Sequence, residues 1–293
     1  MKTVVVLGTS GMLGSMVRFR LERNRALRVV PLARPAFDAE EVLRARDVPQ
    51  LDGADYVVNC VGIIKPYCKD DDAAGVERAI RINAHFPHEL ARAAARRGAR
   101  LIQIATDCVY SGARGEYSEA DAHDALDVYG KTKSLGELHV PGALNVRCSI
   151  IGPEAGRATS LLEWFLAQPE NASLNGFAHH RWNGVTTLQF ARLCERIVER
   201  DAFDELAGIA PLLHFLPNEP VSKYELLGLM AEAFGRTVEV RRVDDVGPPV
   251  DRTLTSRYDA FGTLFPPESQ RASLAELAAV LPEYRRFAGP AAA

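Results

Sequence analysis

The amino-acid sequence predicts an α/β fold, a Rossmann doubly wound parallel sheet with a smaller C-terminal substrate-binding lobe. Short β-branched runs alternate with longer amphipathic segments over the first half of the chain, a pattern that is typical of βαβ units. A glycine-rich turn follows the first run, and the pattern changes after Gly152 and Pro153. The chain has 293 residues, about twice the common single-domain size, which leaves room for a second lobe.

Five strands are expected in the first half, and their nearly continuous apolar character predicts burial on both faces of the sheet. These strands are expected at residues 3–7, 27–33, 56–60, 101–105 and 144–148. Two apolar helical faces lie between them, one made of Met12, Leu13, Met16 and Val17 and the other of Ile80, Leu90 and Ala94.

Residues 1–151 are predicted to form the dinucleotide-binding domain, which a helix at 187–199 and an apolar run at 212–216 rejoin within about 187–217. The substrate lobe then comprises residues 152–186 and 218–293. Within it we expect a helix from Val221, a strand at 237–243 and a loop-rich end marked by the proline pairs 248–249 and 266–267.

The composition excludes several classes of protein. The chain carries 35 Lys and Arg against 38 Asp and Glu, so nucleic acid and anionic membranes are not expected partners. Its five cysteines, none in Cys-x-x-Cys spacing, indicate reduced thiols and no metal site. No apolar stretch approaches the roughly 18 residues that span a bilayer, and the first apolar run ends at Gly8, too early for a signal peptide. We expect a cytoplasmic protein.

The glycine-rich turn follows the first expected strand and opens the first expected helix. It comprises Gly8, Thr9, Ser10, Gly11, Met12, Leu13 and Gly14. Backbone amides at such a turn, together with a helix N-terminus, can bind a pyrophosphate. A tight turn without a ligand is the alternative. The context predicts a dinucleotide site.

Arg34 ends the second strand, where NAD-specific folds often carry an acidic residue for the ribose hydroxyls. An arginine there favours a 2′-phosphate, so NADPH is expected, with NADH as the alternative. A solvated Arg34 without a ligand role is the competing interpretation, and Asp38 lies close enough in sequence to approach the adenosine.

Tyr129 and Lys133 are four residues apart, which places both side chains on one face of a helix. An unperturbed tyrosine has a pKa of about 10, so a neighbouring cation helps it to transfer a proton near neutral pH. Thr106 stands at the end of an expected strand upstream. This set of side chains predicts an acid–base site.

The glycine-rich turn, the segment 104–110 and the segment 129–137 together resemble extended short-chain dehydrogenases/reductases, in particular the dTDP-4-dehydrorhamnose reductase-like branch. The resemblance covers about the first 150 residues and implies that Tyr129 donates a proton, that Lys133 binds the nicotinamide ribose and assists Tyr129, and that Thr106 holds the substrate oxygen. It also implies a cofactor cleft lined or shaped by Asn59, Cys60, Val61, Asn83 and Ile150.

Two departures from this family pattern are present. Ala105 replaces a usual serine, and Cys108 replaces a usual aromatic residue near the sugar. The segments 160–165 and 182–187 are more similar to a capsule-associated subgroup of sugar-nucleotide reductases, which widens the expected substrate to a nucleotide-linked keto-deoxysugar or a related keto-heptose. The resemblance and the residue chemistry assign substrate binding to Thr106, Asp107, Cys108, Trp182 and Asn183.

Alternatives remain at this stage. A 4-epimerase that retains its NAD and a non-catalytic, dinucleotide-binding regulatory subunit both fit the fold. Trp182 fits a packed core as well as a stacking role, and Thr186 fits a helix cap. His179, His180 and Arg181 are expected in a solvated loop. A homodimer is compatible with the sequence.

Overall fold

The computed structural model describes residues 1–154 and 159–289, so residues 155–158 and 290–293 of the expected substrate lobe lie outside it. Six parallel strands form a central sheet in the order β10-β5-β4-β3-β1-β2, which confirms the predicted α/β class. Their bounds are Lys2–Leu7 (β1), Leu27–Leu32 (β2), Tyr56–Asn59 (β3), Arg100–Thr106 (β4), Ala143–Cys148 (β5) and Leu212–His214 (β10).

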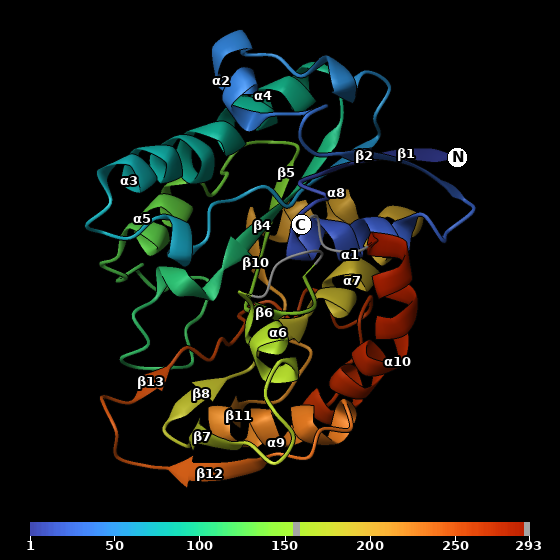
Figure 1. Ribbon diagram of the computed structural model, residues 1–293. Coiled ribbons are helices and arrows are strands. Elements are labelled where there is room, and N and C mark those ends of the chain that lie inside the picture. The colour runs from blue at the N-terminus through green and yellow to red at the C-terminus, as the bar shows by residue number, and fades with distance from the viewer. Residues whose placement is uncertain (155–158, 290–293) are drawn as a thin grey trace.

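Helices cover both faces of this sheet (Figure 1). Along β1, Val4 and Val6 enter one apolar core, and Val5 and Leu7 enter the other, because successive side chains of a strand point to opposite faces. The first face carries α1 (Met12–Leu21), α7 (Thr187–Glu199), α8 (Phe203–Ile209) and part of α10 (Gln270–Ala288), and the second carries α2 (Ala39–Ala45) and α4 (Phe86–Arg96).

One strand differs from the prediction of burial on both faces. β2 lies at an edge of the sheet, and Val29, Val30 and Pro31 are only partly buried there. At the opposite edge, β10 pairs with β5, so the run from Leu212 joins the sheet.

The remaining strands form three small sheets, and β7, β8, β11, β12 and β13 lie at the lower end of the molecule in Figure 1. They are β6 (Ile150–Ile151), β7 (Ser173–Phe177), β8 (His180–Trp182), β9 (Val185–Thr186), β11 (Val221–Ser222), β12 (Glu239–Val243) and β13 (Val250–Asp251). The helices α6 (Leu161–Leu166) and α9 (Lys223–Ala233) lie in the same half of the molecule, and α9 contacts β7, β8, β11 and β12. The expected loop at His180 and Arg181 is therefore wrong, since β8 pairs there with β11 and β13.

The expectation of a loop-rich C-terminal end is also wrong, because α10 runs over 19 residues. Leu274, Leu277, Leu281 and Tyr284 repeat at intervals of three and four and are buried, which is the pattern of a core-facing helix. The sequence did not predict this helix because prolines precede it and Pro282 lies within it, and proline normally disfavours a helix interior. No helix within residues 1–154 and 159–289 is long and apolar enough to cross a membrane.

A π-helical segment, η3 (Ile80–His85), connects α3 (Ala73–Ala79) to α4. A π-turn contains more residues per turn than an α-helix, so the side chains that follow it point in a different direction from those of a continuous α-helix. Ile80, at the start of this segment, is 49% exposed, contrary to the expected apolar face, whereas Asn83 within it is buried.

Candidate active site

A single cavity of about 390 Å³ extends from the glycine-rich turn to the end of β4 and the helix α5 (Val128–Leu135). It lies at the carboxyl ends of the parallel strands, where open α/β sheets bind their ligands. Its lining includes most of the expected site residues: Ser10, Gly11, Met12, Leu13, Cys60, Val61, Thr106, Asp107, Cys108, Tyr129, Lys133 and Ile150.

Gly8 and Gly14 allow the tight conformation of the glycine-rich turn, although neither lines the cavity. Gly8 has a φ of +80°, and a Cβ on Gly14 would stand 2.3 Å from the carbonyl oxygen of Gly8. The close approach is possible only without a side chain. It brings the N-terminus of α1 against the turn, where Ser10, Gly11, Met12 and Leu13 line the cavity. A helix N-terminus with its free backbone amides is the kind of site that binds a dinucleotide pyrophosphate. The residues present here fit that group.

The helix α5 begins where its sequence provides a cap. Asp127 accepts a hydrogen bond from the backbone N–H of Gly130 at 2.7 Å, which satisfies an amide of the first turn. A Cβ on Gly130 would lie 2.6 Å from the carbonyl oxygen of Cys108. Glycine therefore lets α5 approach the segment after β4, and this approach brings Tyr129 to Thr106.

Burial dominates the electrostatics of the Tyr129–Lys133 pair. It raises the pKa of Tyr129 above its usual value, against the effect of a hydrogen bond with Thr106. It lowers the pKa of Lys133 to about 8, with the charge of Glu137 acting in the opposite direction. The Lys133 ammonium donates a 3.2 Å hydrogen bond to the carbonyl oxygen of Ile104. The phenol is therefore protonated and faces a cavity that also contains a cation.

At the end of β4, Thr106 accepts a hydrogen bond from the Cys108 backbone N–H at 3.2 Å and donates one to Asp107 at 3.3 Å. Burial raises the pKa of the Asp107 carboxyl, and the charge of Arg252 opposes this shift. Burial also raises the pKa of the Cys108 thiol to about 12, so Cys108 is not an activated nucleophile.

The two asparagines expected at the cofactor cleft stand behind the cavity. Asn59 is fully buried, donates to Gln103 at 2.7 Å and accepts from the Val61 N–H at 3.1 Å. It does not line the cleft, and this part of the expectation is wrong. Asn83 accepts from the Ile63 N–H at 2.7 Å and donates to the Ile63 carbonyl at 2.9 Å, so it shapes the cavity wall as expected.

Trp182 and Asn183, which were expected to bind substrate, are buried and do not line the cavity. Trp182 is 5% exposed and belongs to the main apolar core. The Asn183 amide is 6% exposed, donates to the Leu254 carbonyl at 2.8 Å and accepts from the Leu254 N–H at 2.9 Å. Both of its polar atoms are thus occupied by the backbone. Thr186 caps α7 in a capping box with Gln189.

Two cations that the sequence analysis did not identify, Lys223 and Arg252, act electrostatically on Asp107 without belonging to the cavity lining. Arg252 donates to the carbonyls of Tyr110 at 3.1 Å and Ser111 at 3.3 Å. Lys223 begins α9, and the charge of Asp107 raises its pKa while burial lowers it more strongly. Neither residue belongs to a local motif. Each approaches the site from the C-terminal third of the chain, so only the fold reveals it.

Lys65 is a further cation beside α5. It forms a 2.7 Å ion pair with Asp127 and lies 5.8 Å from the centre of the Tyr129 ring. Arg34 is exposed just beyond β2, and the Leu32 carbonyl accepts hydrogen bonds from the Gly8 and Thr9 amides. The turn is therefore bonded to the end of β2, two residues before Arg34, although Arg34 itself does not line the cavity.

The family model described as the RmlD substrate binding domain matches residues 1–257. Among curated relatives, methionine adenosyltransferase 2 subunit beta of Danio rerio is 30% identical over 246 residues, which cover 80% of this chain and 74% of the relative. A dTDP-4-keto-6-deoxy-D-glucose reductase of Streptomyces niveus is 31% identical over 137 residues, 46% of each protein.

Solved structures show the same fold. A dTDP-4-dehydrorhamnose reductase from Clostridium acetobutylicum has a TM-score of 0.78 at 22% identity and covers 96% of this chain and 100% of its own. The enzyme of the same name from Bacillus anthracis, in complex with NADP, has a TM-score of 0.73 at 18% identity and covers 94% and 99%. Sugar-nucleotide epimerases and dehydratases also share the fold.

Proposed function

Because the chain belongs to the RmlD substrate-binding-domain family, we propose that it reduces the keto group of a nucleotide-linked deoxysugar with NADPH, in the synthesis of a polysaccharide precursor. One observation carries the proposal: Thr106, Tyr129 and Lys133 line the same cavity as the glycine-rich turn. Convergence of a proton donor, a cation and a carbonyl-binding hydroxyl beside a dinucleotide turn suits carbonyl reduction. In this proposal residues 1–151 and 187–217 bind the cofactor, and residues 152–186 and 218–293 bind the sugar nucleotide.

The side chains of this protein have separate tasks in the reaction. The bound nicotinamide supplies the hydride. Thr106 holds the substrate oxygen and Tyr129 protonates it, since the raised pKa of Tyr129 keeps the phenol in its donor form. Lys133 lines the same cavity as Tyr129, and in this proposal its ammonium stabilises the phenolate that remains, because charges interact more strongly in a buried site.

NADPH is the proposed cofactor because Arg34 stands beside the nucleotide end of the cavity. An exposed guanidinium there can bind a 2′-phosphate in two-pronged geometry, which the ribose hydroxyls of NADH do not offer. NADP in the Bacillus anthracis reductase supports this assignment.

Lys223 and Arg252 replace Trp182 and Asn183 as the proposed substrate-binding residues of the second lobe. Both side chains interact electrostatically with Asp107 and Cys108. Two cations at this end suit the diphosphate of a sugar nucleotide. Arg252 is also pre-oriented by its two backbone carbonyl acceptors, which lowers the entropy lost on binding.

The proposal is tested by replacing the proton donor. Tyr129→Phe should lower kcat by about 100- to 10 000-fold, the usual contribution of a positioned acid, while NADPH affinity stays near that of the parent protein. NADPH oxidation against a panel of dTDP-, GDP- and UDP-linked keto-sugars measures this loss. Nearly full activity of Tyr129→Phe with an active substrate contradicts the assignment. Stoichiometric NAD that survives dialysis would indicate the epimerase instead.

A regulatory subunit is the second candidate function, because the Danio rerio relative is named as the beta subunit of methionine adenosyltransferase 2. The intact set of Thr106, Tyr129 and Lys133 favours turnover. A stable partner that co-purifies with the protein, together with no NADPH oxidation against the whole panel, would favour the regulatory role.

A further inference from the structure

The helix α1, which follows the glycine-rich turn, begins without a side-chain cap. Gly11 is its N-cap residue and has no side chain to accept a hydrogen bond from the first helical turn. By contrast, Asp127 caps α5 and Thr186 caps α7. An uncapped start leaves backbone amides free for a phosphate, but it also allows the first turn to fray. A rigid site here therefore needs support from another group.

Ser15 provides such support from within α1. Its backbone N–H donates to the Gly11 carbonyl at 3.0 Å, and its hydroxyl donates to the Met12 carbonyl at 3.1 Å. Both acceptors belong to residues that line the cavity. A serine hydroxyl has one proton to donate, and the Met12 carbonyl accepts it. The Ser15 hydroxyl oxygen is then available as the acceptor of a second hydrogen bond.

Tyr284, on the C-terminal helix α10, makes this second hydrogen bond. Its hydroxyl lies 2.7 Å from the Ser15 hydroxyl oxygen, and since the Ser15 proton is already used, Tyr284 is the donor. Tyr284 is fully buried and Ser15 is 3% exposed. A buried hydroxyl without a partner is costly, so the bond stabilises both groups. It joins the first turn of α1 to a residue 269 positions away.

Further contacts between α10 and α1 fix the orientation of the Tyr284 ring. The ring meets Phe19 edge-on, with the two centroids 5.6 Å apart, a favourable geometry for an aromatic pair. Arg23 forms a 2.6 Å ion pair with Glu283, and its guanidinium lies 3.5 Å from the centroid of the Phe19 ring. The Tyr284 hydroxyl is therefore presented to α1 in a fixed orientation.

The helix α10 lies beyond the part of the chain that the family model matches. That match ends at residue 257, whereas α10 comprises Gln270–Ala288. Figure 1 shows α10 extending from α1 to the end of the molecule that holds α9. At its start, Gln270 donates to the Gly184 carbonyl at 3.0 Å. The helix thus begins in the second lobe, and its last turns support the cofactor end of the cavity.

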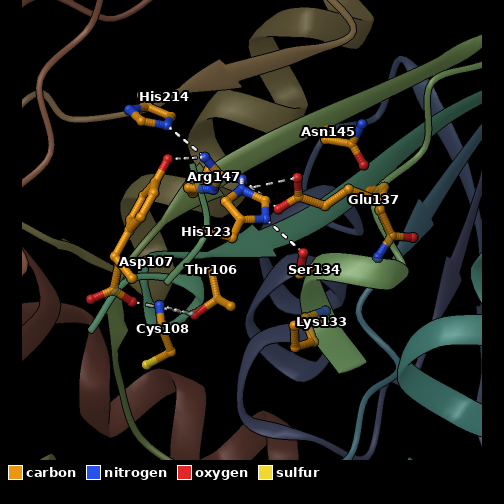
Figure 2. A network of polar contacts seen from close by, with 12 residues as sticks. Thr106, Asp107, Cys108, His123, Lys133, Ser134, Glu137, Asn145, Arg147 and His214 are labelled. Carbon is orange, nitrogen blue, oxygen red and sulfur yellow. Dashed lines mark hydrogen bonds and ion pairs between the residues drawn. The ribbon is translucent and has the colours of Figure 1, made fainter. Parts of the chain in front are cut away.

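A second buried polar network, at the substrate end, does not reach α1. Figure 2 shows this network around Arg147, which is 1% exposed and pairs with Glu137 at 2.5 Å. The side chains labelled there come from positions 106–147 and from β10, so none belongs to α1 or α10. The bond between α10 and α1 is therefore separate from the contacts around the acid–base site, and its loss should leave them in place.

We propose that Tyr284 is a positioning residue which, acting through Ser15, holds the first turn of α1 in the geometry that binds the dinucleotide pyrophosphate. A turn that is already fixed loses less entropy when the cofactor binds. The effect of Tyr284 on cofactor affinity rests on the function proposed above. Its effect on the first turn of α1 does not, and the two effects are measured separately.

The first test is Tyr284→Phe, which keeps the ring and its contact with Phe19 and removes only the hydroxyl. The Kd of NADPH, measured by fluorescence titration, should rise about three- to tenfold, the equivalent of one neutral hydrogen bond. At saturating NADPH, kcat and the KM of the sugar nucleotide should stay within about twofold of the parent values, because the acid–base residues are not displaced. An unchanged Kd would leave Tyr284 with a role in stability alone and overturn the proposal.

A double-mutant cycle tests whether Tyr284 acts through Ser15. Ser15→Ala should raise the Kd of NADPH at least as much as Tyr284→Phe. The double variant Ser15→Ala/Tyr284→Phe should bind NADPH no more weakly than Ser15→Ala alone, because the second change has no bond left to remove. Losses that simply add would show that Tyr284 acts by another route and would contradict the proposal.

Tyr56→Phe is the matched control. Tyr56 on β3 is 1% exposed, its ring meets Phe203 edge-on at 6.2 Å, and its hydroxyl lies 3.4 Å from the Asp201 carboxylate. It does not line the cavity, so its loss should leave the Kd of NADPH unchanged. An equal rise of the Kd in Tyr56→Phe and Tyr284→Phe would indicate a general loosening of the core and would overturn the proposal.

The second test needs no ligand. Amide hydrogen exchange of a peptide covering positions 8–16, read by mass spectrometry, reports local opening of the first turn. Exchange should be faster than in the parent protein in Tyr284→Phe and unchanged in Tyr56→Phe. Exchange at the parent rate in Tyr284→Phe refutes the inference, whatever the reductase assays show. Faster exchange in a protein that binds neither NADPH nor NADH supports the link from Tyr284 to the turn and rejects the proposed function.

Discussion

The two ends of the cavity are built by different kinds of contact. At the nucleotide end, the turn from Gly8 to Gly14 is shaped largely by its own residues and by the nearby end of β2. At the opposite end, Arg252 is held by Tyr110, 142 positions away. The first end is a local structure that a short motif encodes. The second exists only after distant segments have packed together.

Because of this difference, we expect substitutions at the two ends to change different binding properties. A change at the nucleotide end should alter cofactor binding because the backbone itself forms that site. A change at the substrate end should alter the KM of the sugar nucleotide through single side chains. Three substitutions test this division.

Gly14→Ala should have the largest effect. The added methyl would stand 2.3 Å from the Gly8 carbonyl oxygen, so α1 must move away from the turn. Overpacking against a backbone atom costs about 3 kcal/mol, the upper end of the usual range. A turn displaced to relieve this contact must be restored to bind the cofactor, so we expect NADPH affinity to fall by up to about a hundredfold. Fluorescence titration with NADPH measures the change.

Gly228→Ala is the matched control, because a Cβ there meets no atom within 4 Å and the residue lies inside α9. It should leave NADPH affinity unchanged and stabilise the protein by about 0.5–1 kcal/mol. Parent-like NADPH binding by Gly14→Ala would show that the close approach of α1 to the turn is not required.

Arg34→Ala should have the next largest effect, confined to the choice of cofactor. Loss of a charge-assisted hydrogen bond to the 2′-phosphate costs about 1.5–3 kcal/mol, or about ten- to a hundredfold in NADPH affinity. NADH affinity should not change, since NADH lacks that phosphate. Titration with both cofactors gives the ratio, and a ratio equal to that of the parent protein excludes Arg34 from the site.

Arg252→Ala should have the smallest effect, on substrate alone. We expect the KM of the sugar nucleotide to rise about ten- to thirtyfold through loss of one charged contact, with the KM of NADPH unchanged. Arg241→Ala removes a cation of the same lobe that is paired with Glu239 and 62% exposed, and it should leave both constants unchanged. An equal rise in both variants would indicate a general charge effect instead of a diphosphate site.

The sequence analysis was most accurate where a feature is local. Strand periodicity located the five strands of the first half within about two residues, a normal uncertainty for element ends. The four-residue spacing of Tyr129 and Lys133 placed both in the cavity. The sequence analysis left the placement of Trp182 and Asn183 open, because aromatic and amide side chains suit a ligand site and a packed interior equally well, and the structure buries both outside the cavity lining. It also missed α10, where Pro282 interrupts an otherwise regular apolar repeat.

The sequence by itself determined the α/β class, the glycine-rich turn and the helix that carries Tyr129 and Lys133, because each follows from residues close together along the chain. Tertiary structure decided the rest. It brought Lys223 and Arg252 to Asp107, filled the hydrogen-bonding capacity of Asn183 with Leu254, and buried Glu137 against Arg147. The physical reason is that burial and the choice of hydrogen-bond partner depend on segments far apart in sequence, which periodicity and spacing do not relate to one another.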